Sequence, residues 1–240
     1  MQRVLVIADS LAFHGPERPE LLTHEGLWPN VMARQLGVRV DWSVGFGWTA
    51  RDGWWALTKD PVVYSLLLPR ADVVVLALGG MDHLPAMVPT YLREGLAFLR
   101  PGAVRRAARR VFHRAHPYGV RVLGGRLRVL PQAATDAYLT RTVEALRVVR
   151  PGIPVLGVVP PPYRSAYHGH GHVTSTHAAA VAASRRWGTA HDVPLVDLDE
   201  IVTPYADRGD LNPDGLHWGW AAHDAVGRAF AEALARAAQQ

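Results

Sequence analysis

The chain has 240 residues, of which 49% are hydrophobic and 20% are charged, a composition typical of soluble globular proteins. It contains no cysteine, which excludes disulfides, cysteine-based zinc sites and a cysteine nucleophile. No apolar run approaches the ~20 residues of a membrane-spanning helix, and the apolar stretch at 4–8 is too short for a signal peptide. We therefore expect a cytoplasmic protein without a membrane span.

Five short runs rich in Val, Leu and Ile predict strands at 3–8, 39–44, 73–78, 155–159 and 195–198. Unbroken apolar runs are typical of parallel strands that are buried on both faces. Segments with helical periodicity lie between and after them, at 29–36, 89–99, 136–149, 178–190 and 221–238. This alternation predicts a doubly wound, flavodoxin-like α/β fold, with a five-stranded parallel sheet and helices on both faces.

Loops that follow the predicted strands carry the residues suited to chemistry. Asp9 and Ser10 follow the first strand, Gly45 to Gly47 the second, and Gly79 to Asp82 the third. In open α/β sheets, ligands bind at the carboxyl ends of the strands. We expect one domain, 1–240, with two insertions near this site. They are an Arg-rich segment at 100–128 and a Pro-, His- and Gly-rich segment at 160–177.

Positive charge is concentrated in the first of these insertions. The formal net charge is +5, and residues 100–128 contain nine arginines and no Asp or Glu. Such a block favours an anionic partner, although a solvated basic helix face explains it equally well. Nucleic acid is disfavoured as the partner because no recognition motif accompanies the arginines.

Ser10 is a candidate nucleophile because it lies at a strand-to-loop turn. A serine hydroxyl attacks poorly unless a base lies within hydrogen-bonding reach, and an ordinary helix-capping serine also fits this position. Asp214 and His217 lie three residues apart in a turn-forming segment before the last helix, so the carboxylate can orient the imidazole. A capping Asp and a surface His are the alternative for this pair.

Taken together, these segments resemble the SGNH (GDSL-type) hydrolase superfamily along the whole chain. Ala8-Asp9-Ser10-Leu11 stands where that family has Gly-Asp-Ser-Leu, and Asp214 and His217 match its C-terminal Asp-x-x-His. Gly47-Trp48-Thr49 resembles its second block, and Gly79-Gly80-Met81-Asp82 its third, normally Gly-x-Asn-Asp. The resemblance implies a Ser10–His217–Asp214 triad, and an oxyanion hole formed by the amides of Ser10 and Gly47. Met81 replaces the family's oxyanion asparagine and cannot donate a hydrogen bond, so the amide of Gly80 is a further candidate.

A narrower resemblance is carried by Phe13-His14-Gly15-Pro16, the run at 47–61 and Gly79-Gly80-Met81-Asp82. These strings look like the actinobacterial diglucosylglycerate octanoyltransferases, which transfer octanoate from octanoyl-CoA to diglucosylglycerate, a precursor of methylglucose lipopolysaccharides. The resemblance implies an acyl-CoA donor, an anionic sugar acceptor, and neither a metal nor another cofactor. Oligomeric state stays open.

Substrate contacts are expected from aromatic and basic side chains. Trp48, Trp54, Trp55, Trp218 and Trp220 lie around the motif blocks, where rings can line an acyl site or simply fill a core. Arginines bind phosphate and carboxylate groups through paired hydrogen bonds. The expected substrate-binding residues are Trp48, Arg51, Asp82, Trp218, Arg105 and Arg109.

Two other functions stay open at this point. An esterase or carbohydrate deacylase would hand the acyl group to water, and a catalytically inactive SGNH-fold protein would only bind sugar or nucleic acid. Alternating histidines at 168, 170 and 172, with His177, are expected to form a mobile loop over the site rather than a metal centre. Asp9 and Asp82 are expected to support the active-site loops rather than to act as an acid–base pair.

Overall fold

A computed structural model describes residues 1–173 and 175–237 and shows five parallel strands in the order β2-β1-β3-β4-β5. The strands are β1 (Arg3–Ala8), β2 (Arg39–Val44), β3 (Val73–Ala77), β4 (Val155–Val159) and β5 (Leu195–Asp197). This is the flavodoxin-like order, so the predicted fold class is confirmed. All five strands lie where the sequence predicts them, but β3 and β5 each end one residue earlier.

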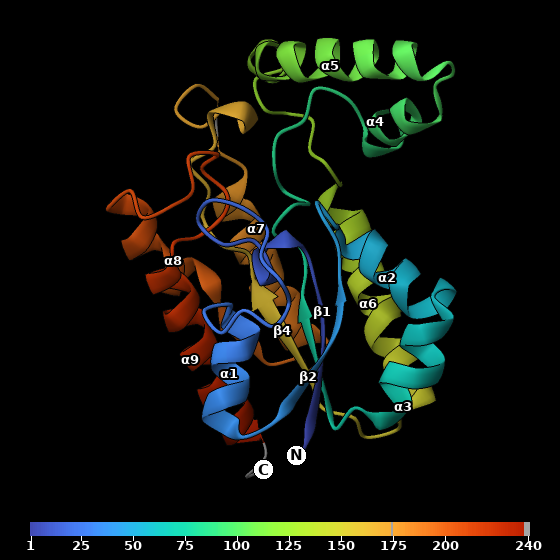
Figure 1. Cartoon of the computed structure of the whole chain (residues 1–240), viewed down its shortest axis with the longest axis vertical. Coiled ribbons are helices and arrows are strands. Elements are labelled where there is room, and N and C mark those ends of the chain that lie inside the picture. Colours follow the sequence, from blue (N-terminus) through green and yellow to red (C-terminus); the bar gives the residue numbers. More distant parts are fainter. Residues whose placement is uncertain (174, 238–240) are drawn as a thin grey trace.

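Helices cover both faces of the sheet (Figure 1). One face packs against α1 (Trp28–Leu36), α8 (Leu198–Asp207) and α9 (Trp220–Ala237). The other packs against α2 (Ala50–Lys59), a π-helical turn η2 (Val63–Leu67) that continues into α3 (Leu68–Arg70), α6 (Gln132–Val149) and α7 (His177–Ala190). Alternate residues of β1 point to opposite faces, so Val4 and Val6 enter the first core and Leu5 and Ile7 the second.

The five predicted helices are present with small shifts at their ends. The helix expected at 89–99 is divided into α4 (Thr90–Gly95) and a 3₁₀ turn, η3 (Leu96–Phe98). Residue 238, the expected end of the last helix, and Thr174, within the expected second insertion, lie outside the described residues. The sequence did not predict α8, because no loop separates this helix from β5. Asp197 is both the last residue of β5 and the N-cap of α8, where its carboxylate accepts a hydrogen bond from the Glu200 amide.

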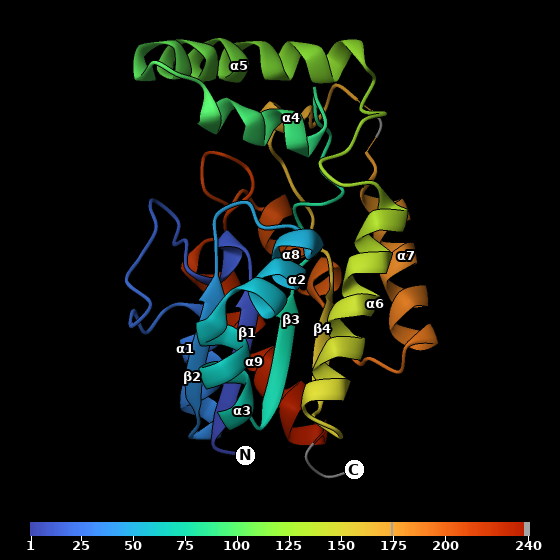
Figure 2. The ribbon, with the colours of Figure 1, turned by 90° about the vertical axis from the view of Figure 1, so that its right-hand side faces the viewer.

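The largest element missing from the sequence prediction is α5 (Gly102–Val122), a helix of 21 residues within the Arg-rich segment. It lies beyond the carboxyl end of the sheet, with α4 beneath it (Figures 1 and 2). The division of the chain into one domain with two insertions stays a prediction. No helix in residues 1–173 and 175–237 is both long and apolar enough to cross a bilayer.

The sheet topology places the end of β1 at the point where the strand order reverses. Ala8, the last residue of β1, pairs with Val44 of β2 on one side and with Ala77 of β3 on the other. The loops that leave these three strands therefore begin side by side. They carry Ser10, Gly47 and Gly80, and such a switch point is where open α/β sheets bind ligands.

Candidate active site

Ser10 begins a single 3₁₀ turn, η1 (Ser10–Ala12), directly after β1. The carboxylate of Asp9 accepts a hydrogen bond from the Leu11 amide at 2.9 Å, which fixes the chain as it leaves the strand. Asp9 is fully buried, and this burial raises its pKa to about 6 despite the hydrogen bond. Asp9 therefore shapes the turn that presents the Ser10 hydroxyl.

Asp214 and His217 share the tight loop that precedes α9. One oxygen of Asp214 accepts from the amides of Leu216 (2.8 Å) and His217 (3.1 Å), and the other lies 2.6 Å from His217 Nδ1. Gly215 has a φ of +70°, and a Cβ there would lie 2.5 Å from the backbone of Arg164. The loop therefore requires glycine at this position.

Ser10, His217 and Asp214 form one hydrogen-bonded chain. His217 Nε2 lies 2.9 Å from Ser10 Oγ, although the two residues are 207 positions apart in the sequence. Burial alone would raise the pKa of Asp214. The hydrogen bonds from the His217 ring and from the Leu216 and His217 amides, with the attraction of the imidazole, outweigh it and hold this pKa well below its usual range. At neutral pH the ionised Asp214 holds a proton on Nδ1 and leaves Nε2 free to accept the serine proton.

A second histidine supports the imidazole of His217 from the side. The ring of His14 stacks on that of His217, with 3.7 Å between ring centroids and 17° between planes. Burial lowers the pKa of His14, so a neutral ring lies against the imidazole. The backbone oxygen of His14 is held in turn by Nε2 of the buried His223, at 3.1 Å. In the sequence, His14 is part of the Phe13-His14-Gly15-Pro16 string, and nothing there indicates that it contacts His217.

The expected oxyanion donors are in the loops that follow the first three strands, with Ser10 after β1, Gly47 after β2 and Gly80 after β3. Within residues 1–173 and 175–237, the amides of Gly47 and Gly80 donate to no backbone or side-chain acceptor. Gly80 and Met81 line the same pocket as Ser10, and the Met81 Cε atom lies 3.9 Å from where a Cβ on Gly47 would be. Met81 thus lies beside the serine where the family pattern has asparagine, and its thioether cannot donate a hydrogen bond.

An apolar pocket opens beside Ser10 and His217. Most of its wall is hydrocarbon. Apart from Ser10, His217 and Asp9, the lining residues are Leu11, Gly80, Met81, Leu84, Pro161, Pro162, Tyr163 and Leu216. The segment at 161–163 follows β4, so the rule that loops after strands line the site applies to it too. A short alkyl chain attached to Ser10 would find an apolar environment here.

Three of the expected substrate-binding residues are in the wrong place for that role. Trp218 is only 1% exposed and packs in the core between the β-sheet and α9. Arg51 is buried, forms ion pairs with Glu94 and Asp52, and lies over the ring of Trp55. Asp82 is only 1% exposed. All three side chains are therefore buried within the fold and contact protein groups rather than a bound substrate.

The remaining three residues of that group are at least partly accessible. Trp48 is half-buried and packs against the core on the α2 side. Arg105 and Arg109 lie on α5, beyond the carboxyl end of the sheet, where Arg109 is exposed. The histidines are not one mobile group, because His168 is 4% exposed and its Nδ1 bonds to the Pro85 backbone oxygen at 2.9 Å.

Asp82 links the loop after β3 to two helices. Its carboxylate accepts from the Ala50 amide at the start of α2 (3.1 Å) and from Thr135 Oγ1 of α6 (2.9 Å). Burial is the largest influence on this group and raises its pKa to about 7, even though both hydrogen bonds act in the opposite direction. The folded protein therefore holds a proton on Asp82 at pH values where the unfolded chain releases it.

We expect Asp82→Asn to make stability less dependent on pH. A carboxyl with a raised pKa stabilises the fold fully below its unfolded value of 3.8 and loses that contribution as pH rises through about 7. The shift corresponds to at most about 4 kcal/mol. The asparagine side chain keeps an oxygen acceptor but does not titrate. In urea unfolding at a series of pH values, the free energy of unfolding of the variant should gain on that of the wild type between pH 3.8 and about 7. A constant difference would contradict the raised pKa.

A second group of polar side chains, which no spacing in the sequence indicates, supports the loop after β3. His83 contacts the Gly79 backbone oxygen and, through its other ring nitrogen, His177. His177 Nε2 lies 2.7 Å from an oxygen of Asp199 on α8. Burial lowers the pKa of His83 to about 3, so the ring next to Gly79 is neutral. These contacts fix the backbone that leads to Gly80.

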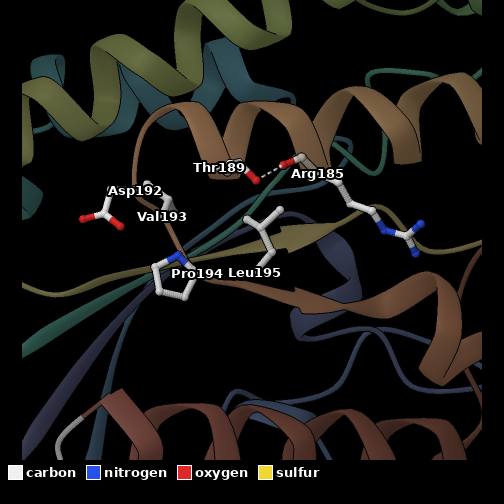
Figure 3. A pocket seen from close by; sticks show the side chains of 7 residues that line it. Arg185, Thr189, Asp192, Val193, Pro194 and Leu195 are labelled. Atoms are coloured by element: carbon white, nitrogen blue, oxygen red, sulfur yellow. Dashed lines mark hydrogen bonds between the residues drawn. The ribbon is translucent and has the colours of Figure 1, made fainter. Parts of the chain in front are cut away.

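Another hollow lies at the opposite end of the sheet. It is lined by Arg185, Thr189, Asp192, Val193, Pro194 and Leu195, around the connection from α7 to β5 (Figure 3). Arg185 there forms an ion pair with Asp197, and the Thr189 hydroxyl donates to a backbone oxygen. These side chains contain no nucleophile with a base beside it, so the pocket next to Ser10 is the better candidate site.

Known proteins with similar sequences include acyl hydrolases and acyltransferases, which agrees with a serine, histidine and aspartate triad. Residues 9–225 match the model of the GDSL-like Lipase/Acylhydrolase family. A protein of Mycobacterium tuberculosis named diglucosylglycerate octanoyltransferase is 39% identical over 98% of this chain and 92% of its own length. A protein of Mycolicibacterium hassiacum with the same name is 38% identical, over 98% and 95%.

Solved structures share the fold at lower identity. A lipase/acylhydrolase from Enterococcus faecalis superposes with a TM-score of 0.64 and 17% identity, covering 98% of this chain and 95% of that one. A carbohydrate acetylesterase family member from Sinorhizobium meliloti gives 0.61 and 18%, with 98% of both chains covered. At these identities the likeness concerns the fold alone. The family match and the two full-length relatives go further, and the chain belongs to the GDSL-like lipase/acylhydrolase family.

Proposed function

We propose that this protein transfers an octanoyl group from octanoyl-CoA to a hydroxyl of diglucosylglycerate through an acyl-Ser10 intermediate. The observation that carries the proposal is the Ser10–His217–Asp214 chain beside an apolar pocket. The proposed acyl group and acceptor are those in the name of the two mycobacterial relatives, diglucosylglycerate octanoyltransferase. Use of a CoA thioester would place the reaction in the cytoplasm.

In the first half-reaction, Ser10 Oγ attacks the thioester carbonyl carbon while His217 Nε2 takes the serine proton. The amides of Ser10, Gly47 and Gly80 stabilise the negative charge that develops on the carbonyl oxygen. As the intermediate collapses, the carbon–sulfur bond breaks and His217 returns the proton to the leaving thiolate. The octanoyl chain is then an ester of Ser10, with its alkyl part in the pocket lined by Met81 and Leu216.

In the second half-reaction, the sugar hydroxyl attacks the Ser10 ester and gives its proton to His217. The bond to Ser10 Oγ breaks, and the proton passes from His217 back to the serine. His217 carries the proton in every transfer, and the proposed reaction needs neither a metal nor another cofactor. The exposed Arg109, with Arg105 one turn before it on α5, is proposed to bind the phosphate groups of CoA.

The direct test is intact-mass spectrometry of the protein with octanoyl-CoA, first alone and then with diglucosylglycerate. We expect an octanoyl adduct on Ser10 that disappears as the sugar gains the same mass. An adduct that decays equally fast without sugar would identify a hydrolase, which gives the acyl group to water. Absence of any adduct, with no transfer to the sugar, would rule the proposal out.

The pocket beside Ser10 leads to a prediction about acyl-chain length. Leu216 is half-buried in its wall, so Leu216→Trp should fill the pocket while the triad stays in place. We expect octanoyl transfer to fall by at least about tenfold, since each buried CH₂ contributes about 0.8 kcal/mol. Acetyl transfer from acetyl-CoA should change little, which serves as the internal control. Equal losses for both donors would mean that the pocket does not hold the acyl chain.

A further inference from the structure

Helix α5 is unusual because it buries very little of its surface. Of its 21 residues, only His116 and Val120 are buried. It contacts the rest of the protein mainly through two short turns, η3 and η4 (Ala166–His168), and through Met87, which packs against Gly119. Figures 1 and 2 show it at the far end of the molecule, beyond the carboxyl end of the sheet. Helices in proteins normally gain most of their stability by packing an apolar face, so a further partner is expected.

The side of α5 that faces away from the protein carries an apolar stripe. Val104, Val111, Tyr118 and Val122 are 48%, 66%, 73% and 68% exposed. Their spacing of seven, seven and four residues places them on one side of the helix. Ala108 and Ala115 lie between them on the same side. The stripe therefore runs along almost the whole helix, and it contains no charged residue.

Arginines border this stripe on one flank. At 100° per residue, Arg110, Arg114 and Arg121 lie about a quarter to a third of a turn away from its centre. All three are exposed, and the range 100–128 contains nine arginines and no acidic residue. An apolar stripe flanked by arginines on a long, exposed helix is the pattern of helices that lie in the interface of a membrane.

We propose that the outer face of α5, defined by Val104, Val111, Tyr118 and Val122 with Arg110, Arg114 and Arg121, docks on an anionic lipid bilayer. The apolar stripe enters the boundary between headgroups and acyl chains, and the arginines contact lipid phosphates. The helix lies parallel to the membrane surface and does not cross it. Because α5 stands beyond the carboxyl end of the sheet, docking brings the Ser10 end of the molecule toward the bilayer.

Charge favours lipid over a second copy of the chain on this face. If two α5 helices packed antiparallel through their stripes, the arginine flanks of both copies would come together. With no acidic residue between 100 and 128, nothing on the helix would compensate this repulsion. Like charges in a protein–protein interface cost several kcal/mol, whereas each arginine strengthens binding to an anionic bilayer.

The test measures binding to vesicles and does not depend on catalysis by Ser10. Purified protein is centrifuged with vesicles of phosphatidylcholine alone, or of equal parts phosphatidylcholine and phosphatidylglycerol. We expect binding only to the anionic vesicles, weaker at high salt. The double variant Arg110→Gln/Arg114→Gln should bind about 25-fold more weakly, since each arginine contributes roughly fivefold. The matched control Arg39→Gln/Arg186→Gln removes the same charge from exposed sites elsewhere and should bind like the wild type.

The apolar stripe is tested separately. Val111→Glu should abolish binding, while Val148→Glu, the same change at a side chain 79% exposed on α6, should bind like the wild type. Equal binding by the two variants would overturn the proposal, as would a wild type that ignores anionic vesicles. Sedimentation velocity decides the alternative. A dimer that Val111→Glu dissociates, without vesicle binding, would assign this face to a second copy instead.

Discussion

Ser10→Ala should reduce octanoyl transfer by about 10⁴- to 10⁶-fold and should give no octanoyl adduct by intact mass. Without Oγ there is no atom to receive the acyl group, and His217 has no proton to take. The side chain is small, and within residues 1–173 and 175–237 it makes one hydrogen bond, to His217 Nε2, so the fold should change little. Initial rates and a thermal melt of the same preparation measure the two effects separately.

The matched control for this variant is Ser65→Ala. Ser65 is exposed in η2, and its hydroxyl only donates to a backbone oxygen one turn earlier. It should keep the wild-type rate and the wild-type adduct. Transfer at full rate by Ser10→Ala would mean that the acyl group passes directly between substrates or through another residue, and the acyl-Ser10 mechanism would be wrong.

The second large effect is expected from Asp214→Asn. Its oxygen can still accept from the Leu216 and His217 amides, so the loop should keep its shape. Its NH₂ group would then face His217 Nδ1, which can accept a hydrogen bond only if the ring proton moves to Nε2. A protonated Nε2 cannot take the proton of Ser10. We expect kcat to fall about 10⁴-fold at neutral pH, with KM little changed.

Asp224→Asn is the control for the loss of a carboxylate. Asp224 lies on α9, where it pairs with Arg228 one turn later and is 46% exposed. Exposed pairs of this kind contribute little, so the rate should be unchanged. If Asp214→Asn kept most of the wild-type kcat, orientation of His217 would have to come from elsewhere, and the stacked ring of His14 would be the first group to test.

The fold was largely predictable because its signals are local. Buried parallel strands are short apolar runs, and four of the helices between or after them have a clear apolar stripe with ends that shift by only a few residues. Helix α5 was not predicted because its segment is dominated by arginines, and because Pro117 and Gly119, which disfavour helix, lie within it. The spacing of the apolar residues from Val104 to Val122 by itself predicts a helix.

Residues in the candidate site were predictable where a short motif defines them, as for Ser10, Asp214 and His217. Side-chain direction was not. Trp218 follows His217 in a segment that bridges to Leu211, and neighbouring residues in extended chain point to opposite sides. The imidazole therefore faces Ser10, and the indole enters the core. Arg51 pairs with Glu94, 43 positions away, a contact that no local pattern reveals.

The pairing of Ser10 with His217 also has a consequence for protein synthesis. The nucleophile Ser10 directly follows the first strand, and its base, His217, lies in the turn before α9. Helix α9 packs against α1. A chain still emerging from the ribosome contains Ser10 long before it contains His217, and N-terminal regions begin to fold first. Until α9 docks, the serine has no base and reacts slowly. Nascent chains should therefore trap acyl groups only slowly, and full reactivity requires both ends of the fold to have come together.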